Sequence, residues 1–245
     1  MAISRENRRK NLYMLRGFGR KNAYDWWWHS FTGYNKITGD PKSFFIEYFV
    51  INPAISPKLI QFGNTSSAVK KGQKPSYVMI KAGAWGTDAK QIHNFYPVKE
   101  LVCNKHRLDL RVGNCTLTEK NITGSVSLNY SEANNHPEYM SSPGSMSWNL
   151  QMDKQIPYNV GYGTSGLFRS LWPFEMYWHA QGVKTLYAGS VILDGEEYTV
   201  TPQRSFGYAD KNWGRDFTNP WLWLSSCNLI SLISGQRLKN SCFDI

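Results

Sequence analysis

Apolar and polar residues alternate along several stretches of the chain. The apolar members are Leu108, Leu110 and Val112 in the first stretch, Val126, Leu128 and Tyr130 in the second, and Met146, Trp148, Leu150 and Met152 in the third. A period of two is typical of strands that bury one face. We therefore predict a strand over each of these stretches.

Two other runs are apolar at almost every position: "SFFIEYFVI" (residues 43–51) and "SYVMIKAGAW" (residues 76–85). Such runs favour strands with both faces covered. Turn dipeptides such as Asp194-Gly195 separate the runs, and the sequence contains no long amphipathic helix. Polar stretches at 63–76 and 131–145 predict long loops. The pattern indicates an all-β fold, mostly antiparallel, arranged as a barrel or a sandwich.

Composition supports this fold class. The 245 residues are enough for one large β domain or two small ones, and 15% are aromatic whereas only 19% are charged. That balance favours sheets and ring-lined cavities over helical bundles.

The formal charge of +10 is concentrated near the N-terminus, where seven basic residues oppose only Glu6 within residues 1–21. We interpret this segment as a basic tail, either solvated or in peripheral contact with an anionic membrane surface. Nucleic acid is not expected as a partner, because the basic residues do not lie among the aromatic ones.

No apolar run follows the basic tail, and nowhere do eighteen uncharged apolar residues occur together. A cytoplasmic protein, peripheral to a membrane at most, is therefore expected. The four cysteines lack metal-binding spacing, so we expect no metal site and free thiols; Cys103–Cys115 and Cys227–Cys242 are the pairs that an oxidising compartment would allow.

Three segments carry candidate chemistry. The first is "NAYDWWWHSF" (residues 22–31), where a strand would place Trp26 and Trp28 on one face and Trp27 and His29 on the other. One face would line a ligand site while the other packs into a core. The alternative for His29 is a hydrogen-bonded structural role.

The second segment is "WPFEMYWH" (residues 172–179), in which Glu175, Tyr177 and His179 would share one face of a strand. This row is a candidate site, and a solvent-facing edge is its alternative. Glu47 lies alone in an apolar run; we expect its face to be open to solvent, with an ion pair or a neutral buried acid as the alternatives.

The third segment is "YADKNWGRDFTNPWLWLSS" (residues 208–226). In an extended chain, Asp210 and Asn212 point to one face and Lys211 and Trp213 to the other, while Trp221 and Trp223 share a face further on. The alternative is a surface Asp-Lys pair beside a tryptophan core.

This third segment resembles the tocopherol cyclase family, whose members carry an acidic-Lys-Asn-Trp-Gly stretch followed by a W-x-W strand. "YDWWWHSFTGY" and residues 176–198 are also similar to that family. The resemblance implies two consecutive lipocalin-like β-barrels, here residues 22–165 and 166–245. Family members continue beyond "NSCFDI", so either the sequence is a truncated form or the second sheet is incomplete and is covered by another element, such as a second copy of the chain.

The resemblance also implies chemistry: a hydrophobic prenylated or polyene ligand whose alkene is protonated and then cyclised or hydrated, without a cofactor. Asp210 would be the acid, although many relatives have Glu there, and Glu175 and His179 are further catalytic candidates. The expected ligand-binding residues are Trp26, Trp28, His29, Tyr177, Asn212, Trp213, Trp221 and Trp223. The alternatives are a non-catalytic isoprenoid carrier and a carbohydrate-binding β protein.

Overall fold

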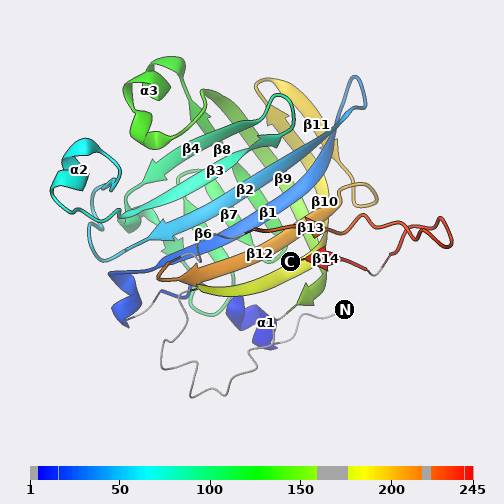
Figure 1. Cartoon of the computed structure of the whole chain (residues 1–245), viewed down its shortest axis with the longest axis horizontal. Coiled ribbons are helices and arrows are strands. Elements are labelled where there is room, and N and C mark those ends of the chain that lie inside the picture. The colour runs from blue at the N-terminus through cyan, green and yellow to red at the C-terminus, as the bar shows by residue number, and fades with distance from the viewer. Residues whose placement is uncertain (1–4, 16, 159–175, 217–221, 240, 245) are drawn as a thin grey trace.

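The structure, a computed structural model, describes residues 5–15, 17–158, 176–216, 222–239 and 241–244 (Figure 1). Their strands are β1 (Tyr24–Asn35), β2 (Pro41–Ile51), β3 (Tyr77–Trp85), β4 (Lys90–Tyr96), β5 (Val102–Cys103), β6 (Asp109–Val112), β7 (Cys115–Thr118), β8 (Asn121–Leu128), β9 (Gly144–Tyr158), β10 (Met176–Leu193), β11 (Glu196–Val200), β12 (Gly207–Gly214), β13 (Ser225–Ser226) and β14 (Phe243–Asp244). The helices are α1 (Arg5–Lys10), α2 (Ser66–Lys70) and α3 (Tyr130–Asn135), with the 3₁₀ turns η1 (Gly17–Arg20), η2 (Val98–Glu100) and η3 (Pro137–Tyr139).

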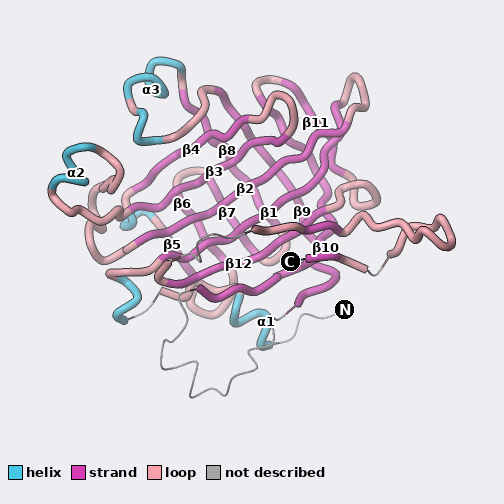
Figure 2. The backbone as a smooth tube through the Cα atoms, viewed as in Figure 1, coloured by secondary structure: helices cyan, strands magenta, loops and turns pink. Residues whose placement is uncertain are grey.

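Twelve of these strands form one antiparallel sheet in the order β4-β3-β2-β1-β11-β10-β9-β8-β7-β6-β5, and β12 pairs with both β1 and β10. The sheet folds over on itself, so that β6–β9 cross behind β1–β4 (Figure 2). The Asn94 side chain on β4 closes part of the seam: its amide nitrogen donates to the carbonyl of Ser127 on β8, 2.9 Å away. The result is a mostly β protein with a barrel core, as the sequence predicts.

The predicted strands are confirmed as β2, β3, β6, β8 and β9, with one correction. Tyr130 does not extend the β8 strand but begins α3 and is exposed. The Asn129 side chain accepts from the backbone of Glu132, and the Glu132 side chain accepts from the backbone of Asn129. This capping box starts a helix where the apolar alternation indicated a strand.

The strands on either side of residue 165 share a single sheet. β10 pairs with β9 along most of its length, and β12 lies between β10 and β1. The predicted boundary between residues 165 and 166 lies outside the described residues, so the division into two domains stays a prediction. Beyond residue 221, β13 and β14 form a separate two-stranded sheet.

The main core fills the space between the two halves of the folded sheet. Trp27, Phe31 and Tyr48 from one half meet Leu117 and Trp148 from the other. A smaller, second cluster packs on the opposite face of β1 and β12 and includes Trp28, Phe45 and Tyr208. Since side chains alternate along a strand, neighbouring residues of β1 and β12 belong to different clusters.

Residues 11–15, predicted as part of a basic tail, are packed against the barrel. Leu12 and Leu15 are buried, and the indole nitrogen of Trp27 donates to the carbonyl of Asn11 at 2.8 Å. The Asn11 side chain in turn donates to both carboxylate oxygens of Glu119 at 3.0 Å. This part of the N-terminal segment is therefore a fixed element of the fold.

Candidate functional site

Strand β12 separates its two charged residues as the period of two predicts. Asp210 is paired in register with Trp28 of β1 and Ala180 of β10, whereas Lys211 is paired with Trp27 and His179. Residues opposite one another in a sheet share a face. Asp210 therefore lies with the second cluster, and Lys211 points into the main core.

The Asp210 carboxylate is buried and receives two hydrogen bonds on one oxygen. Its Oδ2 accepts from the indole nitrogen of Trp178 at 2.8 Å and from the Tyr208 hydroxyl at 3.1 Å. Its Oδ1 is closed to solvent and has no hydrogen-bond partner among the described residues. Oδ2 is thus held by two protein donors, whereas Oδ1 makes no hydrogen bond within the described part of the chain.

Burial raises the pKa of Asp210 to about 7, because removing water disfavours the carboxylate. The hydrogen bonds from Trp178 and Tyr208 act in the opposite direction, and the carboxylates of Asp244 and Glu47 add to the rise. A carboxyl group with a pKa near neutrality holds a proton that it is able to give up, as a general acid requires.

Aromatic rings surround Trp28, the cross-strand neighbour of Asp210. Phe45 stacks on Trp28 at a centroid distance of 5.3 Å, Trp26 meets it edge-on at 5.8 Å, and Trp223 meets it edge-on at 6.4 Å. Trp223 also contacts Tyr208, at 5.1 Å. Trp28 is only 8% exposed, whereas its neighbour Trp85 is 43% exposed and brings the cluster to the surface.

Glu47 lies on the same face and is not open to solvent, which corrects the expectation from the sequence. It is opposite Trp28 on β2, and it forms an ion pair with Lys81 on β3. The Lys81 ammonium lies 5.5 Å from the centre of the Trp28 ring. Burial raises the pKa of Glu47, and the Lys81 cation opposes that rise.

Asp244 supplies a further carboxyl group, beside Trp223 of the ring cluster. The indole nitrogen of Trp223 donates to its Oδ1 at 2.8 Å, just as Trp178 donates to Asp210. Burial raises the pKa of Asp244. Two of the three carboxyl groups at the site, Asp210 and Asp244, thus each accept a hydrogen bond from a tryptophan.

Lys211, on the other face, forms a fully buried ion pair with Asp25. Its ammonium lies 4.0 Å from the centre of the Trp27 ring, and the second Asp25 oxygen accepts from the backbone nitrogen of Met14 at 2.6 Å. Burial lowers the pKa of Lys211 and raises that of Asp25, while the ion pair opposes both shifts. The Lys211 and Asp25 side chains therefore both have partners within the core.

Four predicted site residues belong to this core face and are not near Asp210. His29 is buried, with its Nδ1 3.0 Å from the Tyr187 hydroxyl, and burial lowers its pKa well below the usual value. This is the structural alternative. His179 is fully buried at the Lys211 position, and Tyr177 stacks on Trp213 at 5.6 Å.

The structure brings together Asp210, Trp26, Trp28, Asn212 and Trp223 from the predicted set. Glu175 and Trp221 lie outside the described residues.

The site also contains residues that were not predicted, among them Trp178, Tyr208, Lys81 and Asp244. Periodicity was the available signal for Tyr208 and Trp178, because both alternate away from the core face. No local signal marks Lys81 or Asp244, which come from distant elements.

Among the described residues, no group of three or more His, Cys, Asp or Glu side chains is placed to hold a metal ion. The four cysteines are unpaired. No helix in the described part of the chain is long and apolar enough to cross a membrane.

The fold and site together define a mostly β, barrel-based protein with a buried acid against a ring cluster. No family model and no curated protein matches the chain. Among solved structures, a Nitrosomonas europaea protein provisionally named AttH is similar, with a TM-score of 0.50 and 10% identity over 84% of this chain and 58% of that one. A structure of CghA with Sch210972 is also similar, with a TM-score of 0.37 and 12% identity over 80% and 46% of the two chains.

At these identities the first likeness shows the fold alone. The chain has an AttH-like fold and spans less than two thirds of the length of the structures that it resembles.

Proposed function

We propose that this protein binds a hydrophobic prenylated or polyene molecule against the Trp28 cluster and catalyses acid-promoted cyclisation or hydration of an alkene. The tocopherol cyclase-like sequence segment supports the reaction class. The observation that carries the proposal is the buried Asp210 carboxyl, whose Oδ1 has no hydrogen-bond partner among the described residues. A protonated Oδ1 would be a hydrogen-bond donor that has no acceptor among the described residues.

The proposed step begins when the Asp210 carboxyl gives its proton to one alkene carbon. The π electron pair forms the new C–H bond, and the other alkene carbon becomes a carbocation. A phenol oxygen of the ligand, or water, then forms a C–O bond with that carbon and releases its proton. That proton returns to the Asp210 carboxylate, so the acid is regenerated.

The rings have a definite role in this step. A carbocation near the face of a tryptophan is stabilised by about 0.5–2 kcal/mol per contact. Trp28 and Trp223 lie next to Asp210 and its partner Tyr208. The Lys81 ammonium already lies near the Trp28 ring and forms an ion pair with Glu47. We therefore assign the carbocation to the side of the cluster nearer Trp223.

A non-catalytic isoprenoid carrier is the second candidate, because the same apolar cluster would bind the same ligands. Carbohydrate binding is less well supported. A stacking platform for sugars requires an exposed flat ring, and Trp28 is covered by Phe45 and Trp223.

Two further expectations belong to this proposal. The protein would be cytoplasmic and in peripheral contact with membranes, and residues 22–165 and 166–245 would form two lipocalin-like β domains.

The first experiment identifies the ligand class by mass spectrometry of an organic extract of the purified protein, and a prenylated phenol or polyene found there becomes the assay substrate. Asp210→Asn should lower turnover by about 100-fold or more while changing ligand affinity less than about threefold. Asp40→Asn, at an exposed position, is the matched control and should leave both unchanged. Unchanged turnover in Asp210→Asn would contradict catalysis by this acid, and binding without any turnover in the unmodified protein would favour the carrier.

A further inference from the structure

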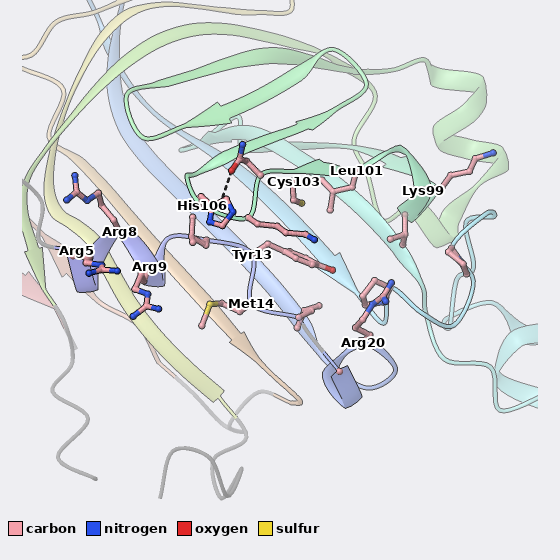
Figure 3. A pocket seen from close by; sticks show the side chains of 18 residues that line it. Arg5, Arg8, Arg9, Tyr13, Met14, Arg20, Lys99, Leu101, Cys103 and His106 are labelled. Atoms are coloured by element: carbon pink, nitrogen blue, oxygen red, sulfur yellow. Dashed lines mark hydrogen bonds between the residues drawn. The ribbon is translucent and has the colours of Figure 1, made fainter. Parts of the chain in front are cut away.

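A large cavity lies on the core side of β1, at the end of the barrel where residues 5–20 pack. It has a volume of about 1240 Å³ and is lined by residues from 5–20, from 98–106 and by Pro53 and Pro57 (Figure 3). Its floor is connected to the main core, because Tyr13 stacks on Trp27 at 6.4 Å. Asp210 points to the opposite face of the sheet, so the cavity is separate from the ring cluster.

The cavity wall has an apolar part and a basic part. The floor is apolar and consists mainly of Leu12, Tyr13, Leu15, Val98 and Leu101. The rim is basic: Arg5, Arg8, Arg9, Arg20, Lys99 and Lys105. No Asp or Glu is found among the described residues that line the cavity. Arg5, Arg8 and Arg9 gather at one end, while Arg20 and Lys99 lie at the other, with Tyr13 between them (Figure 3).

The rim charge is not neutralised within the described part of the chain, where none of the six basic side chains forms an ion pair. The two acids that bind the N-terminal segment, Asp25 and Glu119, already have other partners. Asp25 pairs with Lys211, and Glu119 binds Asn11 and Lys154. A concave site with charge of one sign attracts the opposite charge, and an anion would relieve the repulsion between the basic groups.

The rim is also held in place. The Asn11 carbonyl accepts from Trp27, its side chain donates to Glu119, and the backbone nitrogen of Met14 donates to Asp25. These bonds anchor the segment that directly follows α1, the helix whose Arg8 and Arg9 line the cavity. A preformed site of this kind binds a small ligand at low entropic cost.

We propose that this cavity is a second binding site, for a small amphiphile with a phosphate or carboxylate head and an apolar chain. The head would bind at the Arg5, Arg8 and Arg9 end, where guanidinium groups form paired hydrogen bonds with such anions. The chain would lie over Tyr13 toward Leu101. The volume is sufficient for a lipid-sized molecule.

Isothermal titration with monomeric decyl phosphate tests this proposal, with decyl glucoside and inorganic phosphate as the comparison ligands. We expect saturable binding of one decyl phosphate, and binding at least about tenfold weaker for each comparison ligand, which lacks either the charge or the chain. The double variant Arg8→Gln/Arg9→Gln should weaken decyl phosphate binding by about tenfold or more. Both positions are exposed, so the variant should fold normally.

Lys70→Gln/Lys71→Gln removes the same charge from exposed positions at the end of α2, outside the cavity, and should change the affinity less than twofold. Asp210→Asn should likewise leave it unchanged. The proposal is overturned if Arg8→Gln/Arg9→Gln binds decyl phosphate normally, if Asp210→Asn abolishes binding, or if inorganic phosphate binds as tightly as decyl phosphate. Binding to phosphatidylglycerol vesicles without any binding of monomeric decyl phosphate would also overturn it, since the basic segment would then be a membrane contact.

Discussion

Asp210 and Lys211 are adjacent residues in one strand, and both are buried, yet their surroundings differ in kind. Lys211 has a carboxylate partner in Asp25, and the remaining oxygen of that partner is hydrogen-bonded as well. Asp210 has two neutral donors on one oxygen and none on the other, and the carboxylates of Asp244 and Glu47 raise its pKa further. A compensated buried charge is explained by the fold, whereas an uncompensated one requires another explanation.

Other polar groups of the two faces differ in the same way. On the core face, His29 and Lys154 each have a defined partner in Tyr187 and Glu119. On the Asp210 face, Asp244 likewise accepts from an indole nitrogen, and burial raises its pKa. These charged and titratable groups of the core face therefore have partners, whereas on the other face burial raises the pKa of Asp210 and of Asp244.

Removing the cation of the buried Lys211–Asp25 ion pair should change the free energy of unfolding most. Lys211→Met leaves Asp25 buried without its cation and should lower the free energy of unfolding by about 3–5 kcal/mol, measured by urea denaturation at pH 7. Asp25→Asn/Lys211→Met removes both charges, so its loss should be clearly smaller. Equal losses in the single and double variants would contradict the view that the pair is held by mutual compensation.

Replacing the Asp210 carboxyl group should change the free energy of unfolding less, and in the opposite direction. The folded pKa of Asp210 is about 7 against an ordinary value near 3.8, so the folded state prefers the protonated form. Its contribution to stability is complete below about pH 4 and is lost as the pH rises through 7. Asp210→Asn should therefore be more stable than the unmodified protein at pH 8, by on the order of 2–4 kcal/mol, and lose this advantage near pH 4.

Urea denaturation of both proteins at a series of pH values from 4 to 8 measures this difference. The Asp40→Asn variant, at an exposed position, should show no such trend. A stability difference between Asp210→Asn and the unmodified protein that does not vary with pH would show that Asp210 is ionised throughout the range.

Much of this arrangement was predictable from local pattern. The alternation around Leu110, Val126 and Leu150 predicted strands that the structure contains, and the period of two placed Asp210 and Lys211 on opposite faces. The same period separated Trp28 from Trp27. These predictions succeeded because a strand fixes which residues share a face, whatever it packs against.

The pattern could not show which face carries the site, because that depends on partners from distant elements. Trp178 lies 32 residues before Asp210, and Lys211 is 186 residues from Asp25. Glu47 illustrates the same point, since its partner Lys81 is supplied by the neighbouring strand and is invisible in the apolar run that contains Glu47. At Tyr130, by contrast, a local capping signal was present, and it overrides the apolar alternation.

Asp210 is a buried acid whose raised pKa lets it keep a proton near neutral pH. Its side-chain carboxyl carbon can be followed by ¹³C NMR in protein labelled at aspartate, with the resonance assigned by its disappearance in Asp210→Asn. We predict a titration midpoint near pH 7. A midpoint below pH 5 would contradict the claim, because Asp210 would then be an ordinary carboxylate at the pH where the proposed chemistry needs an acid.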